Sequence, residues 1–225
     1  QSRGPIGAKV MAEMIEHRGA TGVVTFDLHA DQIQGFFNIP ITHLEGKNIF
    51  DSYIASIYNE NTILCGPDEE IVLSSCDAGG VKRVKRMVTK LKQKHSIDVN
   101  YVVIDKTRTK ANSVESVTII GDVKGKHVII VDDMIDTFGS ADKAVDGLID
   151  AGAKSVRMIA SHGVLSGPAL DRIANSKLSQ LIISNSLELN VPENHPIRDK
   201  IKVISLATQI AFAITSINSR TSFEK

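Results

Sequence analysis

The stretch Val128-Ile-Ile-Val-Asp-Asp-Met-Ile-Asp-Thr-Phe-Gly-Ser140 decides the fold. Its first four residues are branched and apolar, which predicts a buried strand. Two acids follow at once, and a third acid comes before Thr137, Gly139 and Ser140. Beyond them an amphipathic helix is expected, whose apolar face would carry Ala141, Ala144, Val145, Leu148 and Ile149. A buried strand that runs into such a helix is the repeating unit of α/β proteins.

The same alternation of short apolar runs and helical patterns extends along most of the chain. Strands are expected at residues 22–27, 71–74, 99–104, 117–121, 127–131, 155–160, 180–184 and 201–205. Helices are expected from Ala8 to a stop at Gly19 and at residues 49–58, 80–94, 140–151, 167–175 and 206–217. This order predicts an α/β protein with a mostly parallel sheet, in which ligands bind outside the carboxyl ends of the strands.

Length and composition are those of an ordinary globular protein. The 225 residues are 42% hydrophobic and 23% charged, and Lys+Arg and Asp+Glu balance at 26 each. That balance gives no global reason to expect nucleic acid or a membrane as partner, so phosphate binding has to be local. Cys65 and Cys76 have no metal-binding spacing, and no apolar run approaches the length of a membrane span. A cytoplasmic location is therefore expected.

The acids and hydroxyls after the buried strand predict a sugar-phosphate site. The start of a helix offers unpaired N–H groups, which with Gly139 and the hydroxyls of Thr137 and Ser140 make a cradle for a phosphate. Asp132 and Asp133 are placed to accept hydrogen bonds from vicinal sugar hydroxyls. The alternative is that Asp136 or Thr137 merely caps the helix, but two adjacent acids at a strand end contribute nothing to folding.

This block resembles the phosphoribosyl-diphosphate-binding signature shared by phosphoribosyltransferases and ribose-phosphate diphosphokinases. Five other stretches resemble the diphosphokinases, in order and nearly from end to end. They are Ser2-Arg-Gly-Pro-Ile-Gly-Ala-Lys9, Asp27-Leu-His-Ala-Asp-Gln-Ile-Gln-Gly-Phe-Phe37, Asp77-Ala-Gly-Gly-Val-Lys-Arg83, Gly121-Asp-Val-Lys124 and Ser161-His-Gly-Val-Leu-Ser-Gly-Pro-Ala169. Transferases that consume phosphoribosyl diphosphate do not carry the block at residues 27–37, which favours the diphosphokinases.

The resemblance implies tandem type I phosphoribosyltransferase-like domains with parallel sheets. The first domain would comprise residues 1–46 with the C-terminal segment 206–225, and it would be truncated because family members carry a long segment before the Ser2–Lys9 block. The second, catalytic domain would span residues 47–205. The resemblance also implies a homo-oligomer, commonly a hexamer, with sites shared between subunits.

The implied reaction transfers pyrophosphate from Mg-ATP to the C1 hydroxyl of ribose 5-phosphate, giving phosphoribosyl diphosphate and AMP. By resemblance Asp132 and Asp133 orient the ribose, and the 5-phosphate is held by Asp136, Thr137, Phe138, Gly139 and Ser140. Lys106 and Arg108 would be catalytic, on a loop that closes over the triphosphate. Arg3 and His29 would contact ATP.

His29 and Asp77 are implied ligands of the Mg²⁺ that accompanies ATP. The chemistry favours Asp77, because Mg²⁺ prefers oxygen ligands and keeps several waters. Alternatively, His29 does not bind Mg²⁺ and contacts an ATP phosphate directly. Asp27 either faces the site or holds His29 in position.

Several features have a plainer interpretation. The helical cations Lys82, Arg83, Lys85 and Arg86 are typical of a solvated face, and they would help to hold a phosphate only if the start of their helix faces the site. The stretch 161–168 is typical of a loop at the sheet edge, with a structural His162. Phe138 stands where the family usually has a small residue. Two other functions stay open: a phosphoribosyltransferase that uses phosphoribosyl diphosphate, and a non-catalytic regulatory or associated subunit.

Overall fold

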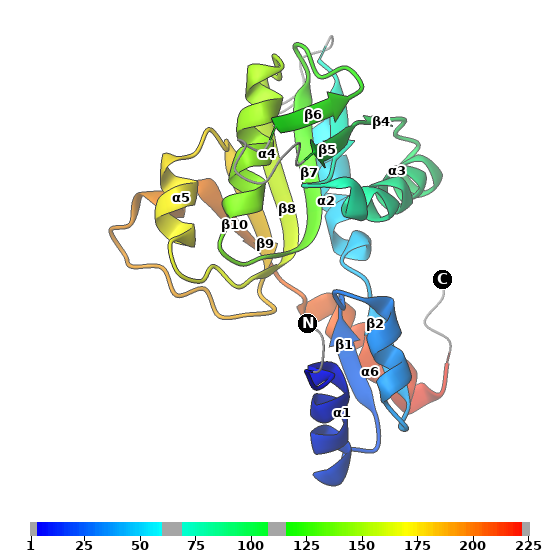
Figure 1. The fold of residues 1–225 in the computed structure, drawn as a ribbon. Helices are drawn as coiled ribbons and strands as arrows, with labels where there is room; N and C mark the ends of the chain where they lie inside the picture. The colour runs from blue at the N-terminus through cyan, green and yellow to red at the C-terminus, as the bar shows by residue number, and fades with distance from the viewer. Residues whose placement is uncertain (1–3, 60–68, 108–115, 222–225) are drawn as a thin grey trace. The chain divides into compact units, whose positions relative to one another are not determined.

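The structure is a computed structural model that describes residues 4–59, 69–107 and 116–221. The chain divides into two compact units (Figure 1). The first comprises Gln1–Gly46 with Leu206–Lys225, and the second comprises Lys47–Ser205.

A parallel sheet organises the second unit. Within its described residues the sheet has six strands in the order β10-β9-β8-β7-β3-β4. Their bounds are β3 (Ile71–Ser74), β4 (Asn100–Tyr101), β7 (His127–Ile135), β8 (Ser155–Gly163), β9 (Gln180–Ser184) and β10 (Ile201–Ile204). Strands β3 and β7 are inner strands, and their continuous apolar runs suit burial on both faces.

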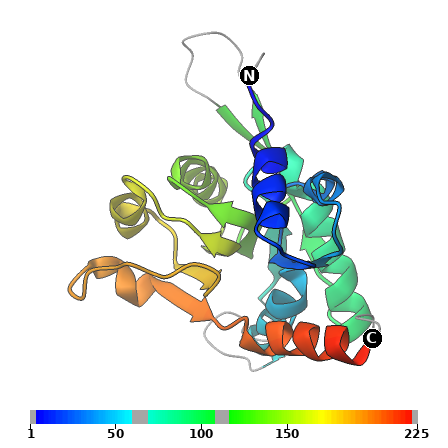
Figure 2. The same cartoon turned by 90° about the horizontal axis from the view of Figure 1, so that it is seen from below.

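Helices cover both faces of this sheet. The helices are α2 (Lys47–Asn59), α3 (Val81–His95), α4 (Gly139–Asp150) and α5 (Ala169–Asn175), and the single turns are η2 (Ala78–Gly80) and η3 (Pro196–Lys200). Figure 2 shows α2 and α3 on one side of the sheet and α4 and α5 on the other. Two buried clusters follow this division: Ile129 and Val131 belong to one, and their neighbours Val128 and Ile130 to the other.

The direction in which the strands are added reverses between β3 and β7. From β3 the chain passes through α3 to β4 at one edge, whereas from β7 it passes to β8, β9 and β10 toward the other edge. The connections therefore leave β3 and β7 on opposite faces, so a crevice is expected between their carboxyl ends, where ligands of open α/β sheets bind.

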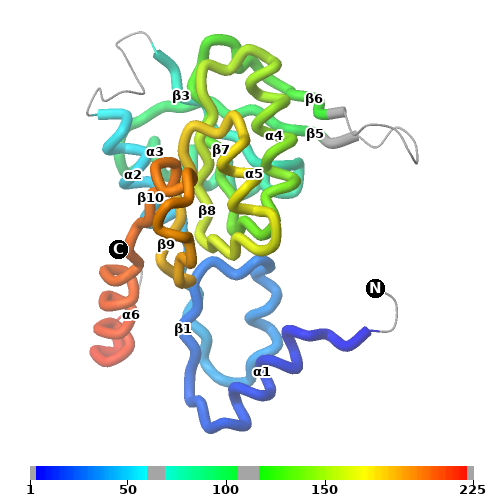
Figure 3. The backbone as a smooth tube through the Cα atoms, turned by 90° about the vertical axis from the view of Figure 1, so that its left-hand side faces the viewer, coloured from blue at the N-terminus to red at the C-terminus, as the bar shows by residue number. Residues whose placement is uncertain are grey.

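The segment between β4 and β7 forms an antiparallel hairpin. Its strands are β5 (Val103–Thr107) and β6 (Ser116–Ile120), and β6 lies beside α4 (Figure 3). The contact is close, since a Cβ built on Gly147 would meet the Val117 side chain at 2.9 Å. The predicted strand 99–104 is therefore two strands that belong to different sheets.

The first unit contains a two-stranded parallel sheet and two helices among its described residues. The elements are α1 (Gly7–His17), β1 (Val23–Phe26), the 3₁₀ helix η1 (Asp31–Phe36), β2 (Ile41–Leu44) and α6 (Ala207–Ser219). Strand β2 was not predicted. In the part of the chain that the structure describes, no helix is long and apolar enough to cross a membrane.

The α/β prediction is confirmed, with two corrections near strand ends. Strand β7 continues to Ile135, so Asp132 and Asp133 lie within it rather than after it. Strand β8 continues to Gly163 and lies between β7 and β9. The prediction of a sheet-edge loop at residues 161–168 is therefore wrong, because its first three residues belong to an inner strand.

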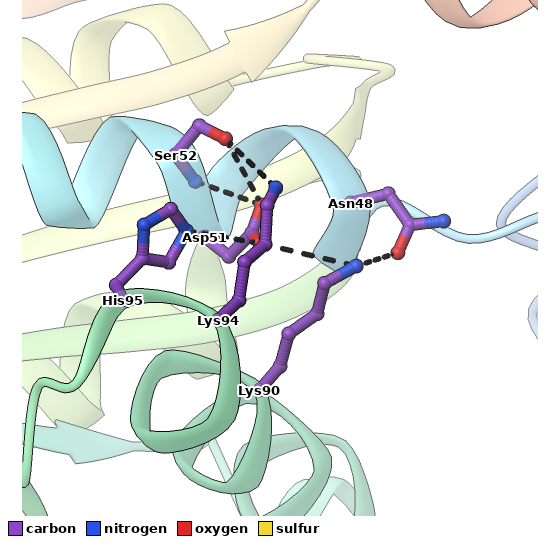
Figure 4. A network of polar contacts seen from close by, with 6 residues as sticks. All are labelled: Asn48, Asp51, Ser52, Lys90, Lys94 and His95. Carbon is purple, nitrogen blue, oxygen red and sulfur yellow. Dashed lines mark hydrogen bonds and ion pairs between the residues drawn. The ribbon is translucent and has the colours of Figure 1, made fainter. Parts of the chain in front are cut away.

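A buried carboxylate joins α2 to the C-terminal end of α3 (Figure 4). The Asp51 side chain is 0% exposed. Its Oδ1 accepts from the Ser52 N–H at 2.7 Å, and its Oδ2 lies 3.0 Å from Lys94 Nζ and 3.2 Å from His95 Nε2. Lys90 Nζ is 3.8 Å away. Cations in the last turn of a helix also interact favourably with its dipole.

Replacing Asp51 with Ala is expected to destabilise the protein by about 3 kcal/mol, because it removes the shared partner of three side chains. Urea unfolding measures the free-energy difference. The matched control is Asp98→Ala, since Asp98 makes an exposed ion pair with Lys92 at 2.8 Å. Its loss should cost about 0.5 kcal/mol or less. Equal effects of the two substitutions would contradict the structural importance of the Asp51 network.

Candidate functional site

Two adjacent carboxylates near the end of β7 share one guanidinium. Nη1 of Arg83, in the first turn of α3, lies 3.0 Å from Asp132 Oδ1, and Nη2 lies 3.0 Å from Asp133 Oδ1. The Asp133 N–H also donates to Asp132 Oδ1 at 2.9 Å. Asp133 is 4% exposed and Arg83 27%. The guanidinium therefore bridges a buried carboxylate and a more accessible one.

The pKa of Asp132 is raised to about 6, first by burial and then by the neighbouring Asp133 carboxylate. The positive charge of Arg83 acts in the opposite direction. Near neutral pH the Asp132 carboxylate is thus ionised at an energetic cost to the fold. Strongly shifted carboxylates of this kind are typical of functional sites.

The turn between β7 and α4 lines a pocket of about 230 Å³ together with the end of β7. The residues around it are Cys76, Asp132, Met134, Ile135, Asp136, Thr137, Phe138, Gly139, Ser140, Ala141 and Met158. Six of the seven predicted ribose 5-phosphate residues thus lie around one pocket, and the seventh, Asp133, is buried and does not line it. The start of α4 faces this pocket, as a phosphate-binding helix N-terminus would.

Phe138 holds the pocket's turn in an uncommon conformation. It has φ 62° and is the N-cap of α4, yet it makes no side-chain capping hydrogen bond. The left-handed region disfavours a bulky residue, so this backbone has to be held by its surroundings. The Phe138 side chain is 3% exposed and packs in the core cluster of the α4 face. Neither Asp136 nor Thr137 occupies the N-cap position, so the capping alternative is wrong.

The connection from β8 to α5 braces the same turn from its other side. The N–H groups of Leu165 and Ser166 donate to the carbonyls of Ile135 and Asp136 at 3.0 and 3.1 Å. The Ser166 hydroxyl also donates to the Asp136 carboxylate. Asp136 is therefore held by the protein itself, which orients the turn around the pocket.

A cation from α5 also holds the turn between β7 and α4. Arg172 Nη1 donates to the Thr137 carbonyl at 3.0 Å, and a Cβ built on Gly139 would lie 3.1 Å from the same nitrogen. Glycine at position 139 thus lets the arginine approach the backbone of the turn.

Asp77 lies across the crevice, after β3. Its Oδ1 accepts from the Gly80 N–H at 3.3 Å, which closes the turn into α3. A Cβ on Gly80 would lie 2.6 Å from the Ser75 Cβ, so glycine is required for this close approach. The Asp77 side chain is exposed, and its carboxylate is a hard oxygen ligand.

His29 belongs to the first unit, in the segment that follows β1. It is exposed, and the segment begins with Asp27 at φ 47°. His43, on β2, accepts a hydrogen bond from the Leu28 N–H at its Nε2, at 2.9 Å. The ring of His43 therefore fixes the loop that carries His29.

Comparison with known proteins finds relatives that match nearly the whole chain. A family described as the phosphoribosyl synthetase-associated domain matches residues 79–225. A ribose-phosphate pyrophosphokinase of Clostridium acetobutylicum is 46% identical over 217 residues, which are 96% of this chain and 63% of that protein. The chain belongs to the ribose-phosphate pyrophosphokinase family.

Two other family members extend this likeness. The Bacillus subtilis ribose-phosphate pyrophosphokinase is 41% identical over 99% of this chain and 64% of its own length. The crystal structure of the Mycobacterium smegmatis phosphoribosylpyrophosphate synthetase has a TM-score of 0.81 and 35% identity, covering 97% of this chain and 66% of that one. The chain thus spans just under two thirds of the length of these pyrophosphokinases.

Other residues carried over from the pyrophosphokinase family fall outside what the structure describes. Arg3 and Arg108 lie outside the described residues, and so does the side chain of Lys106. The backbone of Lys106 pairs with Val117 in the β5–β6 hairpin, so the predicted catalytic loop joins these two strands. The catalytic roles of Lys106 and Arg108 stay predictions, as does a Mg²⁺ ion shared by His29 and Asp77.

The sequence analysis missed four residues that position predicted site residues. They are Arg83, Ser166, Arg172 and His43. Arg83 was assigned to a solvated face because its charged neighbours have the same helical spacing. Ser166 and Arg172 lie in or after a motif that resembles the family, yet nothing local shows which turn they contact.

Replacing Asp132 with Asn should make the fold more stable at pH 7.5, by on the order of 2 kcal/mol. A raised pKa means that the folded state favours the protonated acid. The contribution of Asp132 to the free energy of unfolding of the wild type is therefore fully present below its unfolded-state pKa, near 4. It is lost as the pH rises through about 6. Asn imitates the protonated acid, so the difference should shrink as the pH falls to 4.

Urea unfolding at several pH values measures this difference. The exposed Asp199→Asn variant is the control and should show no such pH-dependent gap. A gap for Asp132→Asn that stays constant between pH 4 and 7.5 would contradict the cost assigned to the ionised carboxylate.

Proposed function

We propose that the protein of which this chain is a part transfers pyrophosphate from Mg-ATP to the C1 hydroxyl of ribose 5-phosphate. The observation that carries the proposal is the pocket at the reversal of strand order, where Asp132 lies beside the turn that begins α4. A carboxylate for sugar hydroxyls next to a helix N-terminus for a phosphate matches the two ends of ribose 5-phosphate.

The turn at residues 136–140 would bind the 5-phosphate through backbone N–H groups and the hydroxyls of Thr137 and Ser140. Asp132 would accept hydrogen bonds from ribose hydroxyls and so orient the sugar. The bracing of this turn by Ser166 and Arg172 supports the role, because transfer depends on a fixed position of the attacking hydroxyl.

Lys106 and Arg108 would neutralise the charge that develops on the triphosphate. Phosphoryl-type transfer requires little covalent help and much positive charge around the transferring group. The position of Lys106 near the end of β5, where its backbone pairs with Val117, is compatible with this role. Arg3 and His29 would contribute to ATP binding from the first unit, which we take to be the remainder of a second phosphoribosyltransferase-like domain.

Asp77 fits the Mg²⁺ that accompanies ATP. Its carboxylate is exposed, and its Oδ1 accepts from the Gly80 N–H within the described turn. Mg²⁺ often binds through one or two carboxylates together with waters and substrate phosphates, so a dedicated cage of protein ligands is not required. When bound, Mg²⁺ neutralises phosphate charge. His29 would be its second protein ligand or a direct ATP contact, and a homo-oligomer is part of the proposal.

The formation of AMP and phosphoribosyl diphosphate from Mg-ATP and ribose 5-phosphate tests the proposal. The assay compares this chain with the same chain joined to the segment that precedes the matching region in the Clostridium acetobutylicum relative. We expect transfer by the joined protein, and a loss of about 100-fold or more in kcat for Lys106→Ala. The control is Lys92→Ala, on the exposed side of α3, which should keep full activity.

A folded joined protein that binds neither substrate would contradict the proposal. Sedimentation of the joined protein tests the homo-oligomer, and a monomer that retains full activity would contradict shared sites.

A non-catalytic associated subunit is the second candidate, favoured by the description of the matched family as an associated domain. It predicts binding of ribose 5-phosphate or nucleotide without AMP formation, and altered activity of a catalytic partner on mixing. Formation of AMP that depends on Lys106 would exclude it.

A further inference from the structure

Arg83 forms an ion pair with each of the two carboxylates of the acid pair. It uses its two terminal nitrogens, one for each carboxylate, at 3.0 Å in both cases. A planar guanidinium suits this two-pronged contact, whereas a lysine ammonium offers a single point of charge. The contact therefore fixes geometry as well as charge.

The two carboxylates differ in access to the pocket. Asp132 lines the pocket and its side chain is 23% exposed, whereas Asp133 is 4% exposed and absent from the lining. Through Arg83, the buried Asp133 is thus connected to the carboxylate that faces the pocket.

Helix α3 is itself held in place along one face and at its last turn, which fixes the position of Arg83. Its apolar side chains Val84, Met87 and Leu91 are buried against the sheet, and its last turn is tied to α2 by the Asp51 network (Figure 4). In that network Lys90 lies about two turns and Lys94 about three turns along the helix from Arg83. The backbone of Arg83 is consequently fixed, and its guanidinium is held beside the two carboxylates.

We propose that Arg83 is a positioning residue for sugar binding, which anchors on Asp133 and holds Asp132 ionised and oriented toward the pocket. The proposal rests on the proposed function, because the ligand is the hydroxyl-bearing face of ribose 5-phosphate. An ionised carboxylate can accept hydrogen bonds from two hydroxyls at once, whereas a protonated one loses part of that capacity. Without Arg83, two neighbouring carboxylates would favour protonation of one of them.

Calorimetric titration of the 225-residue chain with ribose 5-phosphate at pH 7.5 tests the proposal. We expect Arg83→Met to raise the Kd for ribose 5-phosphate about tenfold or more, while the Kd for ATP changes less than about twofold. Arg83→Lys should also bind the sugar phosphate weakly, because it retains the charge without the two-pronged contact. The control is Arg86→Met, an exposed arginine one turn further along α3, which should bind as the wild type does.

A titration of the aspartate side-chain carbons by ¹³C NMR separates this role from a merely structural one. In Arg83→Met the pKa of Asp132 should rise above its wild-type value, and in Arg83→Lys it should stay close to it. Unchanged sugar binding together with an unchanged Asp132 titration in folded Arg83→Met would overturn the proposal. A wild-type chain, and a joined protein, that bind no ribose 5-phosphate would instead overturn the proposed function, and the role of Arg83 with it.

A double-mutant cycle identifies the anchor. If Asp133 acts through Arg83, the loss of affinity in Asp133→Asn with Arg83→Met should be close to that of either single variant. Fully additive losses would show that Asp133 contacts the ligand by itself and would overturn its role as anchor.

Discussion

Two carboxylates that lie side by side near the end of a buried strand need a compensating cation, and the rest of this site is arranged around that need. Burial makes ionisation costly, and the two negative charges oppose each other. The cation comes from a different element, α3, which lies on the opposite face of the sheet from α4. The site therefore exists only once the sheet and both helix layers have assembled.

The topology explains why the cation and the phosphate-binding turn can meet. Because the strand order reverses between β3 and β7, the connections that follow these strands diverge to opposite faces. Helix α3 brings Arg83 from one side, and α4 begins on the other side at Gly139. The pocket that remains is lined by Asp132 and by Cys76, which comes directly before Asp77.

Most strands and helices were predictable, because burial of one or both of their faces produces a regular spacing of apolar residues in the sequence. The exceptions have local physical reasons. Strand β2 contains Thr42 and His43 and is only four residues long, so its pattern does not differ from that of a loop. Strand β7 continues through Asp132 and Asp133 because its pairing with β8 extends beyond the apolar run. When the partner strand is unknown, acids that follow an apolar run are interpreted as the start of a loop.

The candidate site was predictable where one segment supplies it and unpredictable where distant segments do. Residues 136–140 follow each other in the chain, so their common place around a pocket follows from one turn. Arg83 is 49 residues from Asp132, and Arg172 is 35 residues from Thr137. Nothing in the spacing of charges on α3 or α5 distinguishes a side chain that reaches the site from one that faces water. Only the packing of the helices on the sheet determines which of these side chains reach the site.

Two unfavourable features lie at this pocket, and each is held by a contact from elsewhere. Phe138 retains φ 62° because its ring packs in the core, and the turn beside it is held through Ser166 and Arg172. The ionised Asp132 is held by Arg83. Contacts of this kind make local strain persist, since a residue left to itself would relax or take up a proton. A sugar phosphate entering this pocket would thus meet a carboxylate and a turn that are already in place, and little of its binding energy would be needed to arrange them.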